Sequence, residues 1–160
     1  MKLIVIISSI IFVIDQIIKL IISNFLEINH GISIINDFFS LMYVRNYGAA
    51  FSIFNGNRLF LIIVSILSVI LIYKFLLKDK KIGKLESVIY GVLLGGLFGN
   101  LLDRIILGYV IDYLSFKIFG YYFPVFNFAD MCIVISTVFL ILIVGSEKNE
   151  NNSDRGKKIR

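Results

Sequence analysis

Four long apolar stretches constrain the fold of this chain more than any other feature. They cover residues 3–23, 59–77, 85–102 and 128–146. Each has about the 20 residues that a helix needs to cross the hydrocarbon core of a bilayer. The composition agrees, because 58% of the 160 residues are hydrophobic and only 17% are charged, whereas about half of a soluble domain is apolar. The sequence therefore predicts an all-α membrane protein with four transmembrane helices.

The four stretches leave no room for a separate soluble domain. We expect a single membrane-embedded domain over residues 1–146 and a disordered polar tail over 147–160. The first stretch has the position of a secretory signal peptide, but Asp15, Gln16 and Lys19 interrupt its apolar run and no small-residue cleavage site follows. It is therefore expected to remain as a membrane helix.

The connections between the stretches predict their orientation. The segment 78–84, KDKKIGK, has four Lys against one Asp, and the tail from Glu147 is rich in Lys and Arg. Because such residues collect on the cytoplasmic side, both termini are expected there. The loops 24–58 and 103–127 are rich in aromatic residues, as is typical of the outer interface. Apolar residues alternate in parts of both loops, which predicts a small extracytoplasmic β cradle.

Other classes of protein fit the sequence poorly. One Cys, Cys132, cannot form an internal disulfide, and with one His, His30, it cannot build a typical zinc site, so no metal or cofactor is expected. His30 lies in a loop, which leaves Cys132 without an evident base, and no local motif supports Ser65 or Ser68 with Lys19. The net charge of +5 lies mainly beside apolar stretches, which indicates membrane topology and not nucleic-acid binding.

Polar and ionisable residues fall in one layer of the predicted bundle. A charged side chain within a span costs about 2.5 to 3.5 kcal/mol and is a candidate functional residue. With the amino terminus inside, these residues lie toward the outer face: Asp15, Lys19, Asn46, Asn100, Asp103, Arg104, Asp112, Asn127 and Asp130. A random scatter would not place nearly all of them at one depth.

Structural roles remain open for several of these residues. Asp15 and Lys19 share a helix face and could form a compensated pair that only stabilises the bundle. Arg104 could extend its charge to the interface or pair with Asp103. Asn127 is a candidate N-cap of the fourth helix, and Asp130 lies in its first turn, where acidic residues are favoured.

A glycine stripe marks the third apolar stretch. Gly91, Gly95 and Gly99 recur every four residues, a pattern that lets a neighbouring helix pack closely. Gly96 and Gly99, beside Asn100, could instead leave room for the backbone of a substrate. We favour close helix packing as the role of the stripe.

Two carboxylates remain as candidates for chemistry, Asp112 and Asp130. If they meet at about 4 Å, their repulsion at an effective dielectric near 20 is on the order of 4 kcal/mol, or about three pKa units. One proton would then be shared, so one aspartate activates a water while its partner donates to the scissile carbonyl. Such a pair hydrolyses a peptide bond without a metal. Their separation along the chain does not by itself establish that they meet.

Five segments together resemble the lipoprotein signal peptidases, also called prolipoprotein or type II signal peptidases. In chain order they are DQIIK at 15–19, RNYGAAF at 45–51, GGLFGNLLDR at 95–104, VIDYLSF at 110–116 and FPVFNFAD at 123–130. With the four spans they cover nearly the whole chain, and the combination is highly specific. Tyr113 stands where the family often has Phe, a departure that leaves the aspartate pair intact.

The resemblance implies an aspartic signal peptidase with Asp112 and Asp130 as its catalytic pair. The supporting and substrate-binding residues that accompany the pair are Asn46, Asn100, Arg104, Asn127, Asp15, Lys19, Gly99 and Ala129. The implied substrate is a prolipoprotein that already carries diacylglycerol on its lipobox Cys and is cut just before that Cys. The implied enzyme lies in the bacterial cytoplasmic membrane, surrounded by lipids, with its site toward the extracytoplasmic face and with sensitivity to globomycin. Because one bundle can hold the whole proposed site, a monomer is expected.

Two other functions make different predictions. A transporter or channel would carry an ion flux that depends on Asp112 or Asp130 and would not cleave peptides. A structural subunit would copurify with a partner and tolerate Asp112→Asn. If the chain is a peptidase, the aromatic outer loop that contains Phe51 and Phe54 could clamp the signal peptide and exclude water.

Overall fold

The computed structural model describes residues 1–49, 53–77 and 82–158. Long helices form most of this part of the chain, in agreement with the four predicted stretches. Their bounds are Lys2–Phe25 for α1, Arg58–Leu71 for α2, Lys84–Ile106 for α3 and Phe128–Lys158 for α4, and a π-helical segment, η2 at Ile72–Leu77, continues α2.

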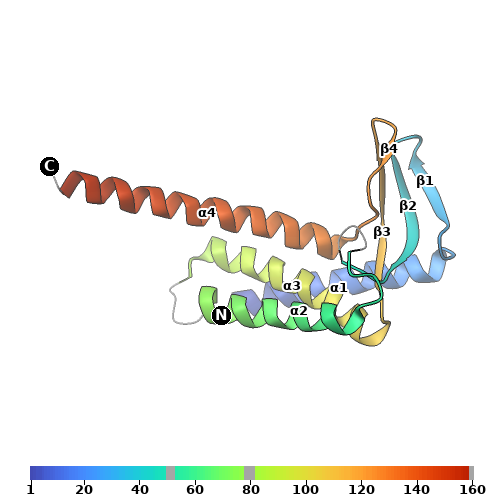
Figure 1. Ribbon diagram of the computed structural model, residues 1–160, viewed down its shortest axis with the longest axis horizontal. Coiled ribbons are helices and arrows are strands. Elements are labelled where there is room, and N and C mark those ends of the chain that lie inside the picture. Colours follow the sequence, from blue (N-terminus) through green and yellow to red (C-terminus); the bar gives the residue numbers. More distant parts are fainter. Residues whose placement is uncertain (50–52, 78–81, 159–160) are drawn as a thin grey trace.

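The two long loops form the predicted small sheet. Its strands are β1 at Gly31–Ile35, β2 at Phe39–Asn46, β3 at Val110–Ile118 and β4 at Tyr121–Tyr122, and they are antiparallel in the order β1-β2-β3-β4. The sheet stands at one end of the helices, while the N-terminus and the far end of α4 both lie at the opposite end (Figure 1). Residues that are far apart in sequence therefore meet where the sheet joins the helices.

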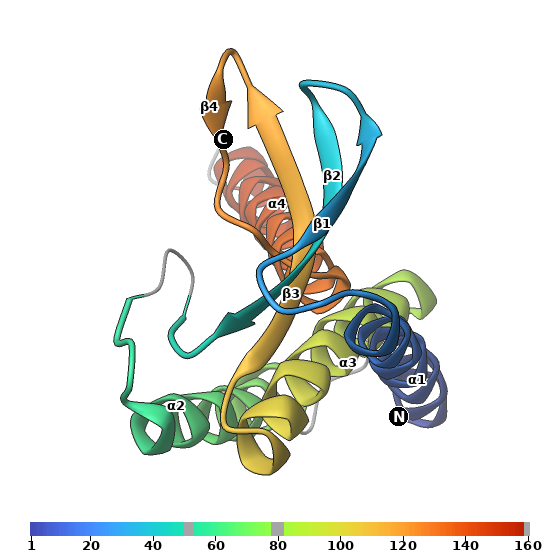
Figure 2. The ribbon, with the colours of Figure 1, turned by 90° about the vertical axis from the view of Figure 1, so that its right-hand side faces the viewer.

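Helix α3 lies at the centre of the helical part. It packs on α1, α2 and α4, and Figure 2 shows it between α1 and α2. The glycine stripe makes this packing close, because a Cβ at Gly91 would come within 2.6 Å of Ile7 and one at Gly95 within 2.6 Å of Ile11. The predicted role of the stripe in close helix packing is thus confirmed.

Several helices present apolar surface outward. By length and composition, α1 and α3 are each able to cross a membrane, and the apolar part of α4, Phe128–Ile143, is shorter. Large hydrophobic side chains such as Ile17 and Phe139 are exposed on the outer faces of α1 and α4. Exposed apolar faces of this extent suit a lipid environment.

The tail differs from its sequence prediction. Residues 147–160 were expected to be disordered, whereas α4 continues as a helix through Lys158. Once a helix has formed, each further residue adds a backbone hydrogen bond at little extra cost. A polar segment that directly follows an apolar helix can therefore extend it.

A compact apolar cluster joins the sheet to the helices. Ile22 of α1 packs with Tyr43 of β2 and with Ile111 and Tyr113 of β3. Alternate residues of a strand point to the same face, so this contact with α1 turns Asp112, between the two β3 residues, toward the other side of the sheet. The β3 register that buries the cluster thereby positions the candidate catalytic carboxylate.

Candidate active site

Asp112 and Asp130 meet where β3 crosses the start of α4. Asp112 is 2% exposed, and Asp130 lies in the first turn of α4. Both line one cavity of about 470 Å³. We call these two residues the aspartate pair. The structure thus brings the two carboxylates to one cavity, which their separation along the sequence could not establish.

The aspartate pair is held by amide donors. The Asn46 side-chain NH2 donates to Asp112 Oδ2 at 2.8 Å, and the Asn127 NH2 donates to Asp112 Oδ1 at 2.6 Å. The Asn100 NH2 donates to Asp130 Oδ1 at 2.7 Å, and the Asn127 backbone N–H donates to Asp130 Oδ2 at 3.2 Å. Each of the four carboxylate oxygens therefore has a fixed donor. Three asparagines that the sequence indicated as site residues supply these donors.

The environment of Asp112 favours its protonated form. Burial raises the pKa of Asp112 to about 7, and repulsion from Asp130 acts in the same direction. The hydrogen bonds from Asn46 and Asn127 oppose this shift. At neutral pH a proton is thus available within the cavity, as general acid–base chemistry requires.

The first turn of α4 is fixed by three other parts of the chain. The backbone N–H of Phe128 donates to the Tyr113 hydroxyl at 3.1 Å, and that of Ala129 donates to Asp15 Oδ1 at 3.2 Å. The N–H of Asp130 donates to Asn127 Oδ1 at 2.9 Å, so Asn127 is the predicted N-cap. Because helix N-terminal N–H groups lack partners within the helix, these contacts hold Asp130 in place.

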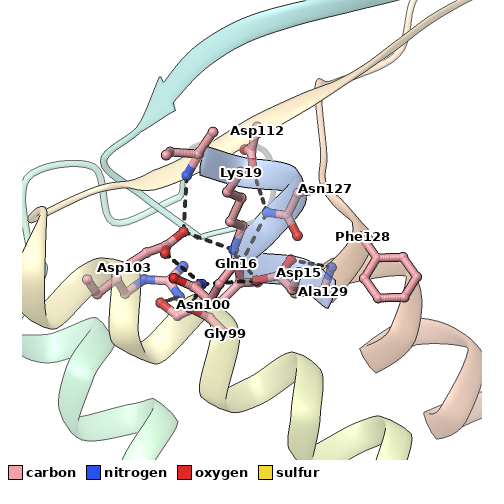
Figure 3. A network of polar contacts seen from close by, with 12 residues as sticks. Asp15, Gln16, Lys19, Gly99, Asn100, Asp103, Asp112, Asn127, Phe128 and Ala129 are labelled. Carbon is pink, nitrogen blue, oxygen red and sulfur yellow. Dashed lines mark hydrogen bonds and ion pairs between the residues drawn. The ribbon is translucent and has the colours of Figure 1, made fainter. Parts of the chain in front are cut away.

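A buried group of charges lies behind the aspartate pair. Lys19 Nζ is 2.8 Å from Asp15 Oδ2 and 2.9 Å from Asp103 Oδ2, and all three side chains are at most 2% exposed. We call these three residues the ion cluster. Gln16 donates to both carboxylates of the cluster, at 3.2 and 3.1 Å. Figure 3 shows Lys19 extending from α1 into this network beside Asn100.

Asp15 and Lys19 lie outside the cavity and contact residues next to the aspartate pair. Asp15 joins the ion cluster to the start of α4 through Ala129, which is fully buried. Gly99 makes room for this arrangement, because a Cβ there would collide with the Asp15 carboxylate. The space at Gly99 is therefore taken by Asp15 and not by a substrate backbone.

Arg104 faces the cavity with the aspartate pair. It donates through one guanidinium nitrogen to the Asn100 carbonyl at 3.3 Å and through another to the Gly48 carbonyl at 3.1 Å. Its Nε is buried without a hydrogen-bond partner among the described residues. The Arg104 charge thus lies inside the site, where it can attract an electronegative group of a substrate.

The sequence reasoning missed the role of Asp103. It placed Asp103 in the polar layer but did not predict a pair with Lys19. The helical spacing contains the signal, since Asp103 lies four residues after Gly99, the position that faces α1. Phe51 of the aromatic loop lies outside the described residues. Phe54 packs its ring on Phe60, with centroids 4.9 Å apart.

The described residues contain no group of three or more His, Cys, Asp or Glu side chains placed to hold a metal ion. The polar side chains that line the cavity are two carboxylates, the Asn46 amide and the Arg104 guanidinium. The walls around them are largely apolar, with Phe126, Met131 and Val134 among the lining residues. This combination suits hydrolysis at a site that also accommodates an apolar ligand.

Comparison with known proteins gives consistent matches. A family model described as Signal peptidase (SPase) II matches residues 7–145. A lipoprotein signal peptidase of Halothermothrix orenii is 39% identical over 145 residues, which are 89% of this chain and 95% of that protein. One from Clostridium tetani is 36% identical over 92% of this chain and 94% of its own length. One from Staphylococcus aureus is 34% identical, with 96% and 94% covered.

Two solved structures, both described as bacterial membrane enzymes, share the fold. The first has a TM-score of 0.85 at 30% identity and covers 94% of this chain and 92% of its own. The second has a TM-score of 0.79 at 31% identity, with 90% and 93% covered. Because the family model and these relatives each extend over most of its length, the chain belongs to the signal peptidase II family of membrane peptidases.

Proposed function

We propose that this protein removes the signal peptide from bacterial prolipoproteins by cutting before a Cys that carries diacylglycerol. The observation that carries the proposal is the aspartate pair in one cavity, with an amide donor on each carboxylate oxygen. The names of the curated relatives support the substrate class, since each is a lipoprotein signal peptidase.

The proposed mechanism is general acid–base hydrolysis. One aspartate of the pair takes a proton from a water that attacks the scissile carbonyl carbon, and the protonated partner donates to the carbonyl oxygen. When the C–N bond of the tetrahedral intermediate breaks, the first aspartate gives its proton to the amine nitrogen and the second recovers a proton from the diol. No covalent intermediate forms, and the pair returns to its starting state.

The proposed setting is the outer surface of the bacterial cytoplasmic membrane. Four spans would place both termini inside and the sheet outside. The Lys-rich segment 78–84 supports this arrangement, and so does the position of the N-terminus and the far end of α4, which both lie opposite the sheet (Figure 1). The cavity then lies at the headgroup layer, where the modified Cys of a lipoprotein precursor is held by its acyl chains. The apolar wall of the cavity on α4, which includes Met131 and Val134, suits those chains.

The test is cleavage of a diacylglyceryl-modified prolipoprotein by protein purified in detergent. Wild type is compared with Asp112→Asn and Asp130→Asn, and the unmodified precursor serves as the substrate control. We expect a shift in gel mobility with wild type and the modified precursor only. Cleavage by either folded variant would contradict the aspartate mechanism, and equal cleavage of the unmodified precursor would contradict the substrate class.

A further inference from the structure

The three asparagines of the site share a feature beyond their contact with carboxylates. A side-chain amide has an oxygen and an NH2 group of nearly the same size, so a rotation by half a turn exchanges acceptor and donor. Which group faces the aspartate pair is therefore decided by the partner of the amide oxygen. In this site every one of those oxygens has a donor.

Two of the amide oxygens are held by backbone groups. Asn46 Oδ1 accepts the Gly48 N–H at 2.9 Å, and Asn127 Oδ1 accepts the Asp130 N–H at 2.9 Å. The backbone itself therefore directs these two NH2 groups toward Asp112. The conformation of a turn and the start of α4 are sufficient to orient both side chains.

Asn100 is oriented differently. Its Oδ1 accepts from the Lys19 ammonium at 2.9 Å and, at the longer distance of 3.3 Å, from the Asn127 NH2. Asn100 lies in α3, where the backbone N–H groups are used by the helix. The stronger donor to this oxygen is thus a charged side chain from α1.

All three N–H donors of Lys19 have an acceptor. An ammonium group has three N–H donors, and three acceptors surround it: Asp15 Oδ2 at 2.8 Å, Asp103 Oδ2 at 2.9 Å and Asn100 Oδ1 at 2.9 Å. The side chain is 2% exposed, so water does not compete for these contacts. The two carboxylates hold the charge in place, and the third donor points at Asn100.

We propose that Lys19 is a positioning residue for the aspartate pair, which it serves by holding the Asn100 carbonyl oxygen so that the Asn100 NH2 faces Asp130. The inference rests on the proposed function of the pair. Without Lys19 the Asn100 amide is free to rotate and to place its oxygen against Asp130, which removes a donor from the ionised carboxylate. The charged groups that act on Asp130 are Lys19 from α1, Arg104 from α3 and Asp112 from β3.

The test needs a variant that removes Lys19 without making the ion cluster more negative than it is in wild type. Lys19→Met combined with Asp103→Asn removes one charge of each sign, and Asp103→Asn alone is the matched control. Relative to that control, we expect kcat to fall by about tenfold or more with KM changed less than about twofold, since the lost hydrogen bond is one to a charged group that acts in the transition state. The acid limb of the pH–rate profile should move to higher pH by about one unit.

A purely structural role for Lys19 predicts a different result. The double variant would then lose stability but keep the kcat and pH profile of its control, and this outcome would overturn the inference while Asp112→Asn remained inactive. If Asp112→Asn were active, the proposed function itself would fail.

If the double variant does not fold, solid-state NMR of the wild type in lipid decides. A dipolar coupling between ¹⁵N-labelled Lys19 Nζ and the ¹³C-labelled Asn100 side-chain carbonyl, together with one between the ¹⁵N-labelled Asn100 side-chain nitrogen and the ¹³C-labelled Asp130 carboxyl, supports the inference. The absence of either coupling overturns it.

Discussion

The ion cluster and the aspartate pair are neighbours with opposite designs. Each contains two aspartates, which are buried except for the partly buried Asp130. In the ion cluster Lys19 lies between Asp15 and Asp103, within 2.9 Å of both, whereas Asp112 and Asp130 have amide donors on every oxygen. A cation placed between two carboxylates offsets their repulsion, whereas two carboxylates that face each other directly favour one shared proton. The same residue type therefore serves structure in one group and is free for chemistry in the other.

The comparison predicts its largest effect in the aspartate pair. Asp112→Asn or Asp130→Asn should lower cleavage by about 10³-fold or more, because the amide neither takes nor gives the required proton. The thermal midpoint in detergent should change little, since the amide has the shape of the protonated acid. A large drop in Tm together with the lost activity would mean that the pair, too, is structural.

The ion cluster should respond in the opposite way. Lys19→Met leaves Asp15 and Asp103 buried without their cation, and such a loss costs about 3 to 5 kcal/mol of unfolding free energy. Denaturant unfolding in detergent measures it. Unchanged stability would contradict the structural role of the cluster.

A smaller steric effect is expected at the contact between α3 and α1. Gly99→Ala places a Cβ against the Asp15 carboxylate and should lower the unfolding free energy by about 1 to 3 kcal/mol, as overpacking does. Cleavage should fall with it, because Asp15 also holds the N–H of Ala129. Full activity and stability would indicate that α1 and α3 separate at no cost.

The pH dependence of stability is expected to reflect the protonation of Asp112 in the aspartate pair. The pKa of Asp112 is raised to about 7, above its value of about 3.9 in an unfolded chain. The folded state therefore holds the extra proton between these values, and stability is expected to fall as pH rises from about 4 to about 7, by at most about 1.4 kcal/mol per unit. Asp112→Asn should flatten this slope, and an equal slope in the variant would assign it to another group.

The smallest effect is expected far from both groups. Lys117 and Asp37 form an ion pair at 2.8 Å on the sheet, where Asp37 is 86% exposed. Asp37→Asn should leave cleavage within about twofold of wild type, because exposed pairs contribute little. A larger loss would extend the functional surface onto the sheet.

Much of the fold could be predicted because the spacing of apolar residues is a local property. The helix bounds, the close packing at Gly91 and Gly95 and the strands in the two loops all follow from nearby residues. The partners of Lys19 differed in how well they could be predicted. Asp15 lies on the same face of the same helix as Lys19, whereas Asp103 comes from another helix. The helical continuation after Glu147 could not be predicted either, because polar composition alone does not show where a helix ends.

The sequence indicated which residues lie near the site, but not the contacts that orient them. Asp112 and Asp130 were candidates from the polar residues alone, and the resemblance placed the three asparagines around them. The orientation of each amide, however, depends on a donor from elsewhere in the chain. Gly48, which orients Asn46, lies two residues away. Lys19, which orients Asn100, lies 81 residues away. No spacing rule connects the second pair.

The contact between Asp15 and Ala129 joins positions 114 residues apart. A ribosome completes α1 early and α4 late, so for most of its synthesis the chain has an Asp15 carboxylate without the backbone N–H that it finally accepts. The aspartate pair cannot form until the last helix has been made and has packed on the earlier ones. A chain assembled in this order therefore has no complete aspartate pair while it is unfinished.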